Sequence, residues 1–521
     1  MQTSQDKLFQ AIEHHQKGNL KEACLIYAEI LSQDSSNLQA MHLFAVARFD
    51  LGYYDEGINL LYKLTELAPN YESFIALGKM CYQCGHKQEA VENFKYALEL
   101  SPDNAELYML IGDYLKEECL IEDAINCYQS SLEIDRAFIA GHFRLGEIFK
   151  DNSRFIEAEA CFQDILKQEA DNISALYMLG EVLGFLGKLE EAVKCFEKVI
   201  RLDPKLDHAY FELSMLYIAL EKFDKGWDYF KYREAIRKKD FRVPEFSCPR
   251  WCGEDISGKQ LYIYPEMGYG DIILAARYLP YLAKKGVKPV FKTADELVEL
   301  FKSSPLNAEI LPRSCDDGLV SFDCYTQALD LPAILWQGKD NIPYKDGYLK
   351  ADKEKIKYYK EKYFSGNDIK LGICWKCKNS FKKDFFRSFN DASILAELSQ
   401  LDCVSLYSPQ KGESEGDLIT LPTGINVINL GKTFSDFSDT AAAISSLNAV
   451  ITVDTSIVHL SGALGAKTYL LSLFPSDFRW FQDTESSSWY SSVRIFRQSE
   501  AESQQEYIIR FCSFLKEELG V

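Results

Sequence analysis

The sequence has no uninterrupted apolar run long enough to cross a membrane, and its opening residues, MQTSQDKLFQAIEHH, have no basic stretch followed by an apolar core. We therefore expect no membrane span, no secretory leader and a cytoplasmic location. The sequence also has no basic excess, since 58 Lys and Arg stand against 78 Asp and Glu, a formal net charge of −20. General binders of nucleic acid or of membrane surfaces carry the opposite sign, so neither is an expected partner.

Cysteine pairs with metal-ligand spacing are few. Two CxxC spacings occur, Cys81/Cys84 and Cys374/Cys377, and neither has the second pair that would complete a zinc site. The 15 cysteines are scattered through periodic segments instead of framing loops. In a chain without a leader, this distribution indicates reduced thiols, many of them buried.

Two nucleotide-binding motifs are missing. No GxxxxGK[ST] occurs, and the turn Gly268-Tyr269-Gly270-Asp271 is followed by Ile272 and Ile273 instead of the third glycine of a dinucleotide fingerprint. A Walker-type ATPase and an NAD-binding enzyme are therefore poor fits. An anionic ligand of so acidic a chain must find a local basic patch.

The first half of the sequence does contain a regular period. One small position recurs every 34 residues, at Gly78, Gly112, Gly146, Gly180 and Ser214. A second small position keeps step with it, at Ala90, Ala124, Ala158, Ala192 and Gly226. An aromatic residue follows each of these by four, at Phe94, Tyr128, Phe162, Phe196 and Phe230. Weaker copies around Ala11 and Ala45 bring the total to about seven units.

This period resembles the tetratricopeptide repeat. Small residues let two antiparallel helices approach, and the aromatic fills the gap beside them. Gly52, Gly85 and Gly187 fall at the turn between helices, where a positive φ favours glycine. Stacked copies share one core and are expected to wind into a superhelix with a concave groove. Such a groove binds a protein segment, and the alternative is that the array is only a scaffold or a dimerisation surface.

The second half changes to a pattern of strand, turn and helix. Predicted strands are LYIY, KPVFKT, IKLGICW, CVSLYS, INVINL, AVITVD and KTYLLSL, with helical runs between them. This alternation predicts two Rossmann-like lobes with parallel sheets, whose ligands lie beyond the carboxyl ends of the strands, in the cleft between the lobes. The expected organisation is a repeat array (1–235), a linker (236–260), an N-terminal lobe (261–350) and a C-terminal lobe (368–521).

The first candidate site segment is the turn after the strand LYIY. Gly268 and Gly270 would let a ligand approach the backbone, and Asp271 stands where a helix begins. Asp271 is either a reactive carboxylate or an N-cap of that helix.

Two further segments follow predicted strands. Asp454, Thr455 and Ser456 crowd a helix start whose dipole favours phosphate, although a capping box without a ligand explains them equally well. His459, on the first turn, faces the cleft or serves only packing. The stretch WKCKNSFKKDFFRS is the best local anion site or else a solvated charged face, with basic residues Lys376, Lys378, Lys382, Lys383 and Arg387 against the single acid Asp384.

Several segments together resemble a bacterial family in which tetratricopeptide repeats precede a GT-B glycosyltransferase domain. This family is related to heptosyltransferases and, more distantly, to O-linked N-acetylglucosamine transferases. The similarity covers nearly the whole chain and includes GWDYFKYRE, PEFSCPRWCGEDISGK, GYGD with ARYLP, VDTSIVHLSGALG, FPSDFRWF and VRIFRQ. The resemblance implies that Asp271 is the catalytic base. It also implies that the C-terminal lobe binds a nucleotide sugar, with Thr455 and Ser456 on its diphosphate and His459 at the matching histidine. Together with the segments described above, this gives an expected donor site of these residues: Gly268, Gly270, Lys382, Arg387, Ser388, Asp454, Thr455, Ser456 and His459.

One segment departs from the family pattern. Relatives show W-S-G-N-P-x-H-x-N-D ahead of R-S, whereas this chain keeps Trp375 but has Lys376 and Cys377 for the small pair and Phe381 for the histidine. This departure keeps a second interpretation open, a repeat adaptor whose transferase domain no longer catalyses.

The expected function is an inverting, metal-independent transfer of a sugar from a nucleotide-activated donor, with no bound cofactor. One base and a fixed positive potential suit a reaction in which a hydroxyl loses a proton and a phosphate leaves. The expected acceptor is a protein in the repeat groove, and the resemblance names flagellin-like or other surface proteins. A glycan or lipid acceptor is a further alternative.

Overall fold

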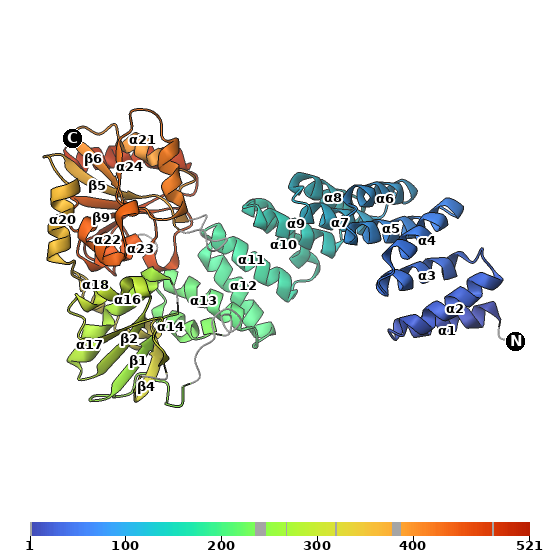
Figure 1. Cartoon of the computed structure of the whole chain (residues 1–521), viewed down its shortest axis with the longest axis horizontal. Helices are drawn as coiled ribbons and strands as arrows, with labels where there is room; N and C mark the ends of the chain where they lie inside the picture. The colour runs from blue at the N-terminus through green and yellow to red at the C-terminus, as the bar shows by residue number, and fades with distance from the viewer. Residues whose placement is uncertain are drawn as a thin grey trace. The chain divides into compact units, whose positions relative to one another are not determined.

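The computed structural model describes residues 3–234, 246–266, 268–317, 320–377, 387–481 and 484–520 (Figure 1). The chain forms two compact units, residues 1–175 and 176–521. Among the described residues, every helix is too short or too polar to span a bilayer.

Every regular element described in the first unit is a helix, and helices of 13 and 14 residues alternate. Asn37, Asn70 and Asn104 each cap the first helix of a pair by accepting a hydrogen bond from the backbone N–H three residues further on. The helices are α1 (Ser4–Gln16), α2 (Leu20–Gln33), α3 (Leu38–Asp50), α4 (Tyr54–Leu67), α5 (Tyr71–Gln83), α6 (Lys87–Leu100), α7 (Ala105–Glu117), α8 (Ile121–Ile134), α9 (Ile139–Asp151) and α10 (Phe155–Gln168).

In four repeats the glycine packs under the aromatic ring of the same repeat. A Cβ atom at Gly78 would lie 2.6 Å from Cε1 of Phe94, and one at Gly112 would lie 2.5 Å from Cε1 of Tyr128. Both rings are buried. The predicted role of the small positions, close helix approach beside an aromatic filler, is therefore confirmed.

The turn inside each helix pair uses a left-handed residue. The glycines predicted for this conformation adopt it, with φ of 89° at Gly52, 83° at Gly85 and 70° at Gly187. The same repeat position is held by Cys119, with φ of 60°, and by Ser153, with φ of 61°. A side chain in this region is strained, so these two turns are less favourable than the glycine turns.

The last repeat belongs to the core of the second unit. This unit begins within α11 (Ile173–Phe185) and continues through α12 (Leu189–Leu202), α13 (Asp207–Ala219) and α14 (Phe223–Phe230). Ile218 and Phe230 are buried in the same cluster as the first strands of the α/β region. The ring centroid of Phe223 lies 4.5 Å from that of Trp336. The α/β region is therefore built directly on the end of the array.

The front lobe contains a parallel four-stranded sheet in the order β3-β2-β1-β4. Its strands are β1 (Gln260–Tyr264), β2 (Lys288–Thr293), β3 (Glu309–Pro312) and β4 (Cys324–Gln327). Its helices are α16 (Tyr269–Ala276), α17 (Tyr278–Lys284), η1 (Asp295–Leu297), α18 (Val298–Lys302), α19 (Asp330–Ile334) and η3 (Lys339–Asn341).

The rear lobe contains a parallel six-stranded sheet in the order β10-β9-β8-β5-β6-β7. Its strands are β5 (Ile369–Cys374), β6 (Val404–Ser408), β7 (Val427–Asn429), β8 (Ala449–Thr452), β9 (Thr468–Ser472) and β10 (Val493–Arg497). The helices of this part of the chain are α20 (Lys353–Tyr363), α21 (Ser393–Leu398), η5 (Glu413–Thr420), η6 (Gly431–Thr433), α22 (Phe437–Ile444), α23 (Ser456–Ala463), η7 (Phe478–Trp480) and α24 (Gln504–Leu519). The predicted fold class, a repeat array followed by two Rossmann-like lobes with parallel sheets, is confirmed.

Part of the segment predicted as a linker packs on the front lobe. The backbone N–H of Trp251 donates to the carbonyl oxygen of Tyr325 in β4 at 2.8 Å, and the Trp251 side chain is buried. The Phe246 ring lies 4.8 Å from that of Tyr325. Residues 235–245 lie outside the described part of the chain, and the domain boundaries given above stay a prediction.

Candidate functional site

Both sheets reverse their strand order next to predicted site segments. In the front lobe the chain runs from β1 outward to β3 and then returns to the other side of β1 with β4. In the rear lobe it runs from β5 outward to β7 and then returns to the other side of β5 with β8. Ligands of open parallel sheets bind at such reversals, beyond the carboxyl ends of the strands. Asp271 follows β1, and Asp454 and Thr455 follow β8.

Asp271 is the third residue of α16 and does not cap it. Gly268 occupies the N-cap position, without a side-chain hydrogen bond. The capping interpretation of Asp271 is therefore wrong. Its Oδ1 instead accepts a hydrogen bond of 2.8 Å from Nη2 of Arg479 in the rear lobe. Because the two side chains are only 14% and 15% exposed, this ion pair is poorly screened by water.

Arg479 lies in η7, on the connection between β9 and β10. Its Nη1 also donates to both carboxylate oxygens of Asp477, at 3.0 and 3.2 Å. Burial lowers the pKa of Arg479, but the carboxylates of Asp271 and Asp477 outweigh this effect and raise the pKa above its usual value. Arg479 is therefore a fixed positive charge between the two lobes.

A second ion pair lies at the end of β8. Arg387 donates from Nη2 to the backbone oxygen of Asp454 at 2.7 Å, and its Nε lies 3.0 Å from Asp454 Oδ2. Burial raises the pKa of Asp454, and the Arg387 guanidinium offsets this only in part. We call the following five residues the inter-lobe charge cluster: Asp271, Arg387, Asp454, Asp477 and Arg479.

The helix start after β8 is capped by Thr455. Its side chain accepts a hydrogen bond of 3.1 Å from the backbone N–H of Ile457. Thr455 is buried, and Ser456, the first residue of α23, is half-buried. The N-terminal dipole of α23 points toward this position and favours an anion there.

His459 and Gly270 form a tight contact between the lobes. A Cβ atom at Gly270 would lie 2.7 Å from Cδ2 of His459, whereas one at Gly268 would meet nothing within 4 Å. His459 Nδ1 lies 3.0 Å from the hydroxyl of Tyr490, and the ring stacks on Trp480 with centroids 5.4 Å apart. Gly268 thus leaves open space at the turn, while the space beside Gly270 is filled by the imidazole.

The imidazole of His459 is uncharged at neutral pH. Burial, followed by the positive charges of Arg479, Arg277 and Arg387, lowers the pKa of His459 well below its ordinary value of 6.5. In the described structure His459 is a buried residue that packs between the lobes. Its predicted contact with the nucleotide-sugar donor stays a prediction.

The predicted basic stretch is described only in part. Lys376 forms an ion pair of 2.7 Å with Asp417, so this lysine does not offer an unopposed charge. Ser388 is buried and its Oγ accepts a hydrogen bond of 3.0 Å from the backbone N–H of Cys377. Residues 378–386, which include Lys382 and Phe381, lie outside the described part of the chain.

Sequence reasoning missed Arg479, Asp477 and the buried Arg277. Arg277 is 0% exposed and donates from Nη1 to the backbone oxygen of Trp489 at 2.7 Å, which ties α16 and α17 to the rear lobe. Its guanidinium lies over the Tyr490 ring, 4.6 Å from the centroid. The signals for them in the sequence are the ARYLP and FPSDFRWF segments, which carry part of the family resemblance.

One cavity in the described part of the chain lies at the opposite edge of the rear sheet from these residues. It has a volume of 690 Å³ and is lined by residues at the amino ends of β9 and β10, among them Lys467 and Arg494. Both cations are paired, Lys467 with Glu518 at 3.1 Å and Arg494 with Glu485 at 3.1 Å. The amino edge is not where parallel sheets bind their ligands, so this cavity does not compete with the charge cluster as the candidate site.

Comparisons with known proteins identify the repeats of the chain. Residues 71–104 and 173–206 match the tetratricopeptide repeat family model. Protein FlbA of Caulobacter vibrioides is 24% identical over 315 residues, which are 55% of this chain and 51% of the relative, so the match spans about half the length of that curated relative.

Two solved structures of repeat proteins resemble part of the chain. The C-terminal part of a repeat-containing protein from Cytophaga hutchinsonii is 16% identical and covers 45% of this chain and 96% of that one, with a TM-score of 0.40. YrrB, described as a tetratricopeptide repeat protein with an unusual peptide-binding site, is 18% identical and covers 35% of this chain and 95% of that one, with a TM-score of 0.30. The chain is thus a tetratricopeptide repeat array followed by an α/β region with two parallel sheets, distantly homologous to FlbA.

Proposed function

We propose that this protein is a GT-B glycosyltransferase that moves a sugar from a nucleotide-activated donor to a protein acceptor held by its repeats. The observation that carries this proposal is the 2.8 Å contact of Asp271 with Arg479, whose charge also interacts with Asp454 at the end of β8. It joins the strand-order reversal of the front lobe to the carboxyl edge of the rear sheet, where open parallel sheets generally bind their ligands. Two Rossmann-like lobes that meet at these edges are consistent with a GT-B domain.

In the proposed reaction Asp271 is the general base. The acceptor hydroxyl gives its proton to the Asp271 carboxylate while its oxygen bonds to the anomeric carbon of the donor sugar. The bond from that carbon to the phosphate oxygen breaks, and the nucleoside diphosphate leaves with the electron pair. Because the acceptor attacks from the face opposite the leaving group, a single displacement inverts the anomeric centre.

The leaving diphosphate needs positive potential that is already in place. Arg387, Arg479 and the N-terminus of α23 supply it from the rear lobe, which supports a metal-independent reaction. Arg479 is held by Asp271 and Asp477. A donor diphosphate would compete for this guanidinium and leave Asp271 free to accept a proton.

The charge of the repeats supports a protein acceptor with basic segments. Residues 1–175 contain 29 acidic and 14 basic residues, so they carry −15 of the net charge of −20. A repeat surface of this sign attracts basic polypeptide and repels anionic glycans and lipid headgroups. Flagellin-like or other surface proteins remain the acceptor class that the family resemblance proposes.

A second candidate, the non-catalytic adaptor, is favoured by one observation. Lys376 replaces a small residue of the transferase pattern and pairs with Asp417. The substitution puts a long side chain, held by Asp417, where the transferase pattern has a small residue. If the rest of the segment is altered in the same way, the lobes bind a partner without catalysing transfer.

The experiment that separates the two candidates measures binding first and turnover second. Thermal unfolding of the full chain is followed with a panel of UDP-, GDP-, ADP-, TDP- and CMP-linked sugars and the free nucleotides. The transferase account predicts a rise in melting temperature with one nucleotide class and release of that nucleotide from its sugar donor. Asp271→Asn should retain the shift and lose the release, while Asp340→Asn, at an exposed position, should retain both. Absence of any shift favours the adaptor.

A further inference from the structure

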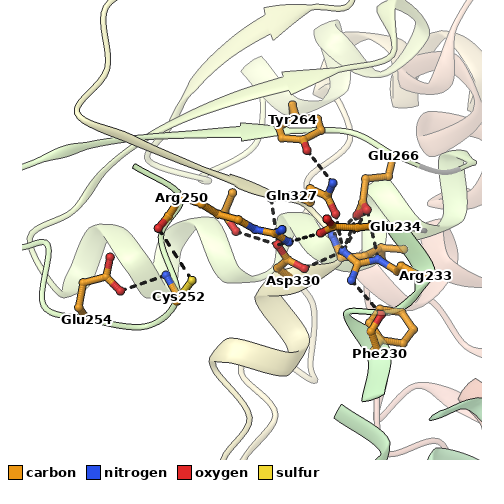
Figure 2. A network of polar contacts seen from close by, with 12 residues as sticks. Phe230, Arg233, Glu234, Arg250, Cys252, Glu254, Tyr264, Glu266, Gln327 and Asp330 are labelled. Carbon is orange, nitrogen blue, oxygen red and sulfur yellow. Dashed lines mark hydrogen bonds and ion pairs between the residues drawn. The ribbon is translucent and has the colours of Figure 1, made fainter. Parts of the chain in front are cut away.

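A guanidinium from the end of the repeat array is buried inside the front lobe. Arg233 follows α14, and its side chain is 1% exposed. Figure 2 shows it facing three acceptors from the front lobe. Nη2 lies 2.9 and 3.0 Å from the two oxygens of Glu266, 2.8 Å from Oε1 of Gln327 and 2.7 Å from Oδ1 of Asp330.

These acceptors mark the place where the front sheet reverses its strand order. Glu266 follows β1, Gln327 ends β4, and Asp330 begins α19. In an open parallel sheet this position is where a ligand binds. Here the Arg233 side chain occupies it, so the end of the array is an integral part of the front lobe.

Glu266 is held from two sides. Its Oε1 accepts from Nε of Arg233 at 3.1 Å, and its Oε2 accepts from the backbone N–H of Leu329 at 3.2 Å. A carboxylate with these partners, 7% exposed, has little freedom. Burial lowers the pKa of Arg233, but Glu266 and Asp330 outweigh this and raise it, so the guanidinium stays charged. Glu266 lies between the end of β1 and the Gly268–Asp271 segment that begins α16. The contacts that hold Glu266 therefore also hold the start of this segment.

A second contact links the last repeat to the same ion pair from the other lobe. Helix α13 packs against η7, the short helix that carries Arg479. The last repeat thus supports both members of the Asp271–Arg479 pair, one through Glu266 and one through η7.

We propose that Arg233 is a positioning residue of the transferase, which fixes the orientation of Asp271 by clamping Glu266. This inference rests on the proposed role of Asp271 as the base. The last repeat is then part of the catalytic domain, and the repeats that precede it hold the acceptor.

The same network contains a matched control. Arg250 Nη2 lies 2.6 Å from Asp330 Oδ2 and also pairs with Glu234, but no contact joins Arg250 to Glu266 among the described residues. Arg250→Lys therefore perturbs the ion-pair network without loosening the turn. Arg233→Lys keeps the charge, but a single ammonium cannot reproduce the forked contacts of the guanidinium to Glu266, Gln327 and Asp330.

The test uses the full-length chain and two independent readouts. Hydrogen exchange of peptides that cover residues 265–276 reports the turn without requiring catalysis. Arg233→Lys should speed exchange there and lower kcat for donor turnover by at least about tenfold, with KM for the donor nearly unchanged. Arg250→Lys should leave the exchange of these peptides and kcat close to wild type. Should Arg233→Lys fail to fold, Glu266→Gln, which removes the charge and keeps the shape, should give the same two effects.

Two results would overturn the positioning role. One is unchanged exchange at residues 265–276 in Arg233→Lys, whatever happens to its melting temperature. The other is an equal loss of kcat in both arginine variants. A third result separates the two claims: faster exchange confined to residues 265–276 of Arg233→Lys, in a protein whose wild type turns over no nucleotide sugar. This result would support the clamp by Arg233 and would contradict only the proposed function.

Discussion

Asp271 Oδ1 and Arg479 Nη2 are 2.8 Å apart, one at the first helix turn of the front lobe and the other on the β9–β10 connection of the rear lobe. The two side chains are nearly buried, and Arg479 is also bound to Asp477. This ion pair brings a carboxylate to the edge of the rear sheet where the helix start at Thr455 lies.

Loss of the Arg479 charge should be more costly than loss of the Asp271 charge. Arg479→Met leaves two nearly buried carboxylates, Asp271 and Asp477, without their cation, and should lower the free energy of unfolding by about 3–5 kcal/mol. Asp271→Asn keeps an oxygen that accepts the Arg479 hydrogen bond, and should cost about 1 kcal/mol. Urea unfolding followed by tryptophan fluorescence measures both. Equal losses would contradict the claim that Arg479 neutralises both carboxylates.

Gly270 should not tolerate a methyl group, although Gly268 should. A Cβ atom at Gly270 would lie 2.7 Å from the ring of His459, which is held between Trp480 and Tyr490 and cannot retreat. Gly270→Ala should therefore destabilise the chain by about 1–3 kcal/mol. Gly268→Ala, with nothing within 4 Å, is the matched control, and thermal unfolding compares them. A stable Gly270→Ala variant would contradict the tight contact between the lobes.

His459 should make the folded state sensitive to mild acid. Its pKa in the folded chain lies well below the ordinary value of 6.5, because of burial and of nearby arginines. As the pH falls below 6.5 only the unfolded chain gains this proton, so stability falls with pH by up to about 1.4 kcal/mol per unit.

The matched variant for this prediction is His459→Gln, which cannot take up the proton. The difference in unfolding free energy between wild type and the variant should shrink from pH 7.5 to pH 5.5. A difference that is constant over this interval would show that His459 is protonated equally in both states.

The strained turns of the array should be improved by glycine. Ser153 adopts φ of 61°, a conformation that costs about 1 kcal/mol for a residue with a Cβ atom. Ser153→Gly should stabilise the repeats by a similar amount, and Gly52→Ala, at φ of 89°, should destabilise them. Circular dichroism of the full chain during heating measures both. A Ser153→Gly variant that is less stable than wild type, or a Gly52→Ala variant that is more stable, would mean that these turns are not strained by a side chain.

The α/β region should fold without the first repeats but not without the last ones. A chain of residues 176–521 keeps α12 to α14 and should fold, because it corresponds to one compact unit. A chain of residues 231–521 loses Ile218 and Phe230 from the buried core and should aggregate. Size-exclusion chromatography distinguishes the two, and a soluble monomer of the shorter chain would contradict the shared core.

The fold was largely predictable because its signals are local. The 34-residue period and the apolar strands before helical runs depend on neighbours in the sequence, and both are borne out. The short strands β3, EILP, and β4, CYTQ, were not predicted. Each has four residues and a proline or polar side chains, so its place in the sheet is fixed by pairing and not by its own pattern.

The candidate site was predictable only where it follows a strand directly. Asp271 and Thr455 could be found because each comes after an apolar run at a helix start. Arg479 reaches Asp271 from a distant connection, which no local pattern reveals. Likewise, the pairing of Lys376 with Asp417 removes a cation that the sequence alone counts as available.

The proposal that Asp271 is the base of a nucleotide-sugar transferase is tested most directly by single-turnover donor consumption in the full chain. The donor is the nucleotide sugar that raises the melting temperature, and wild type is compared with Asp271→Asn. The account predicts donor binding by both with similar Kd, and a rate at least about 100-fold lower in the variant. Equal rates in the two chains, or donor binding by neither, would contradict it.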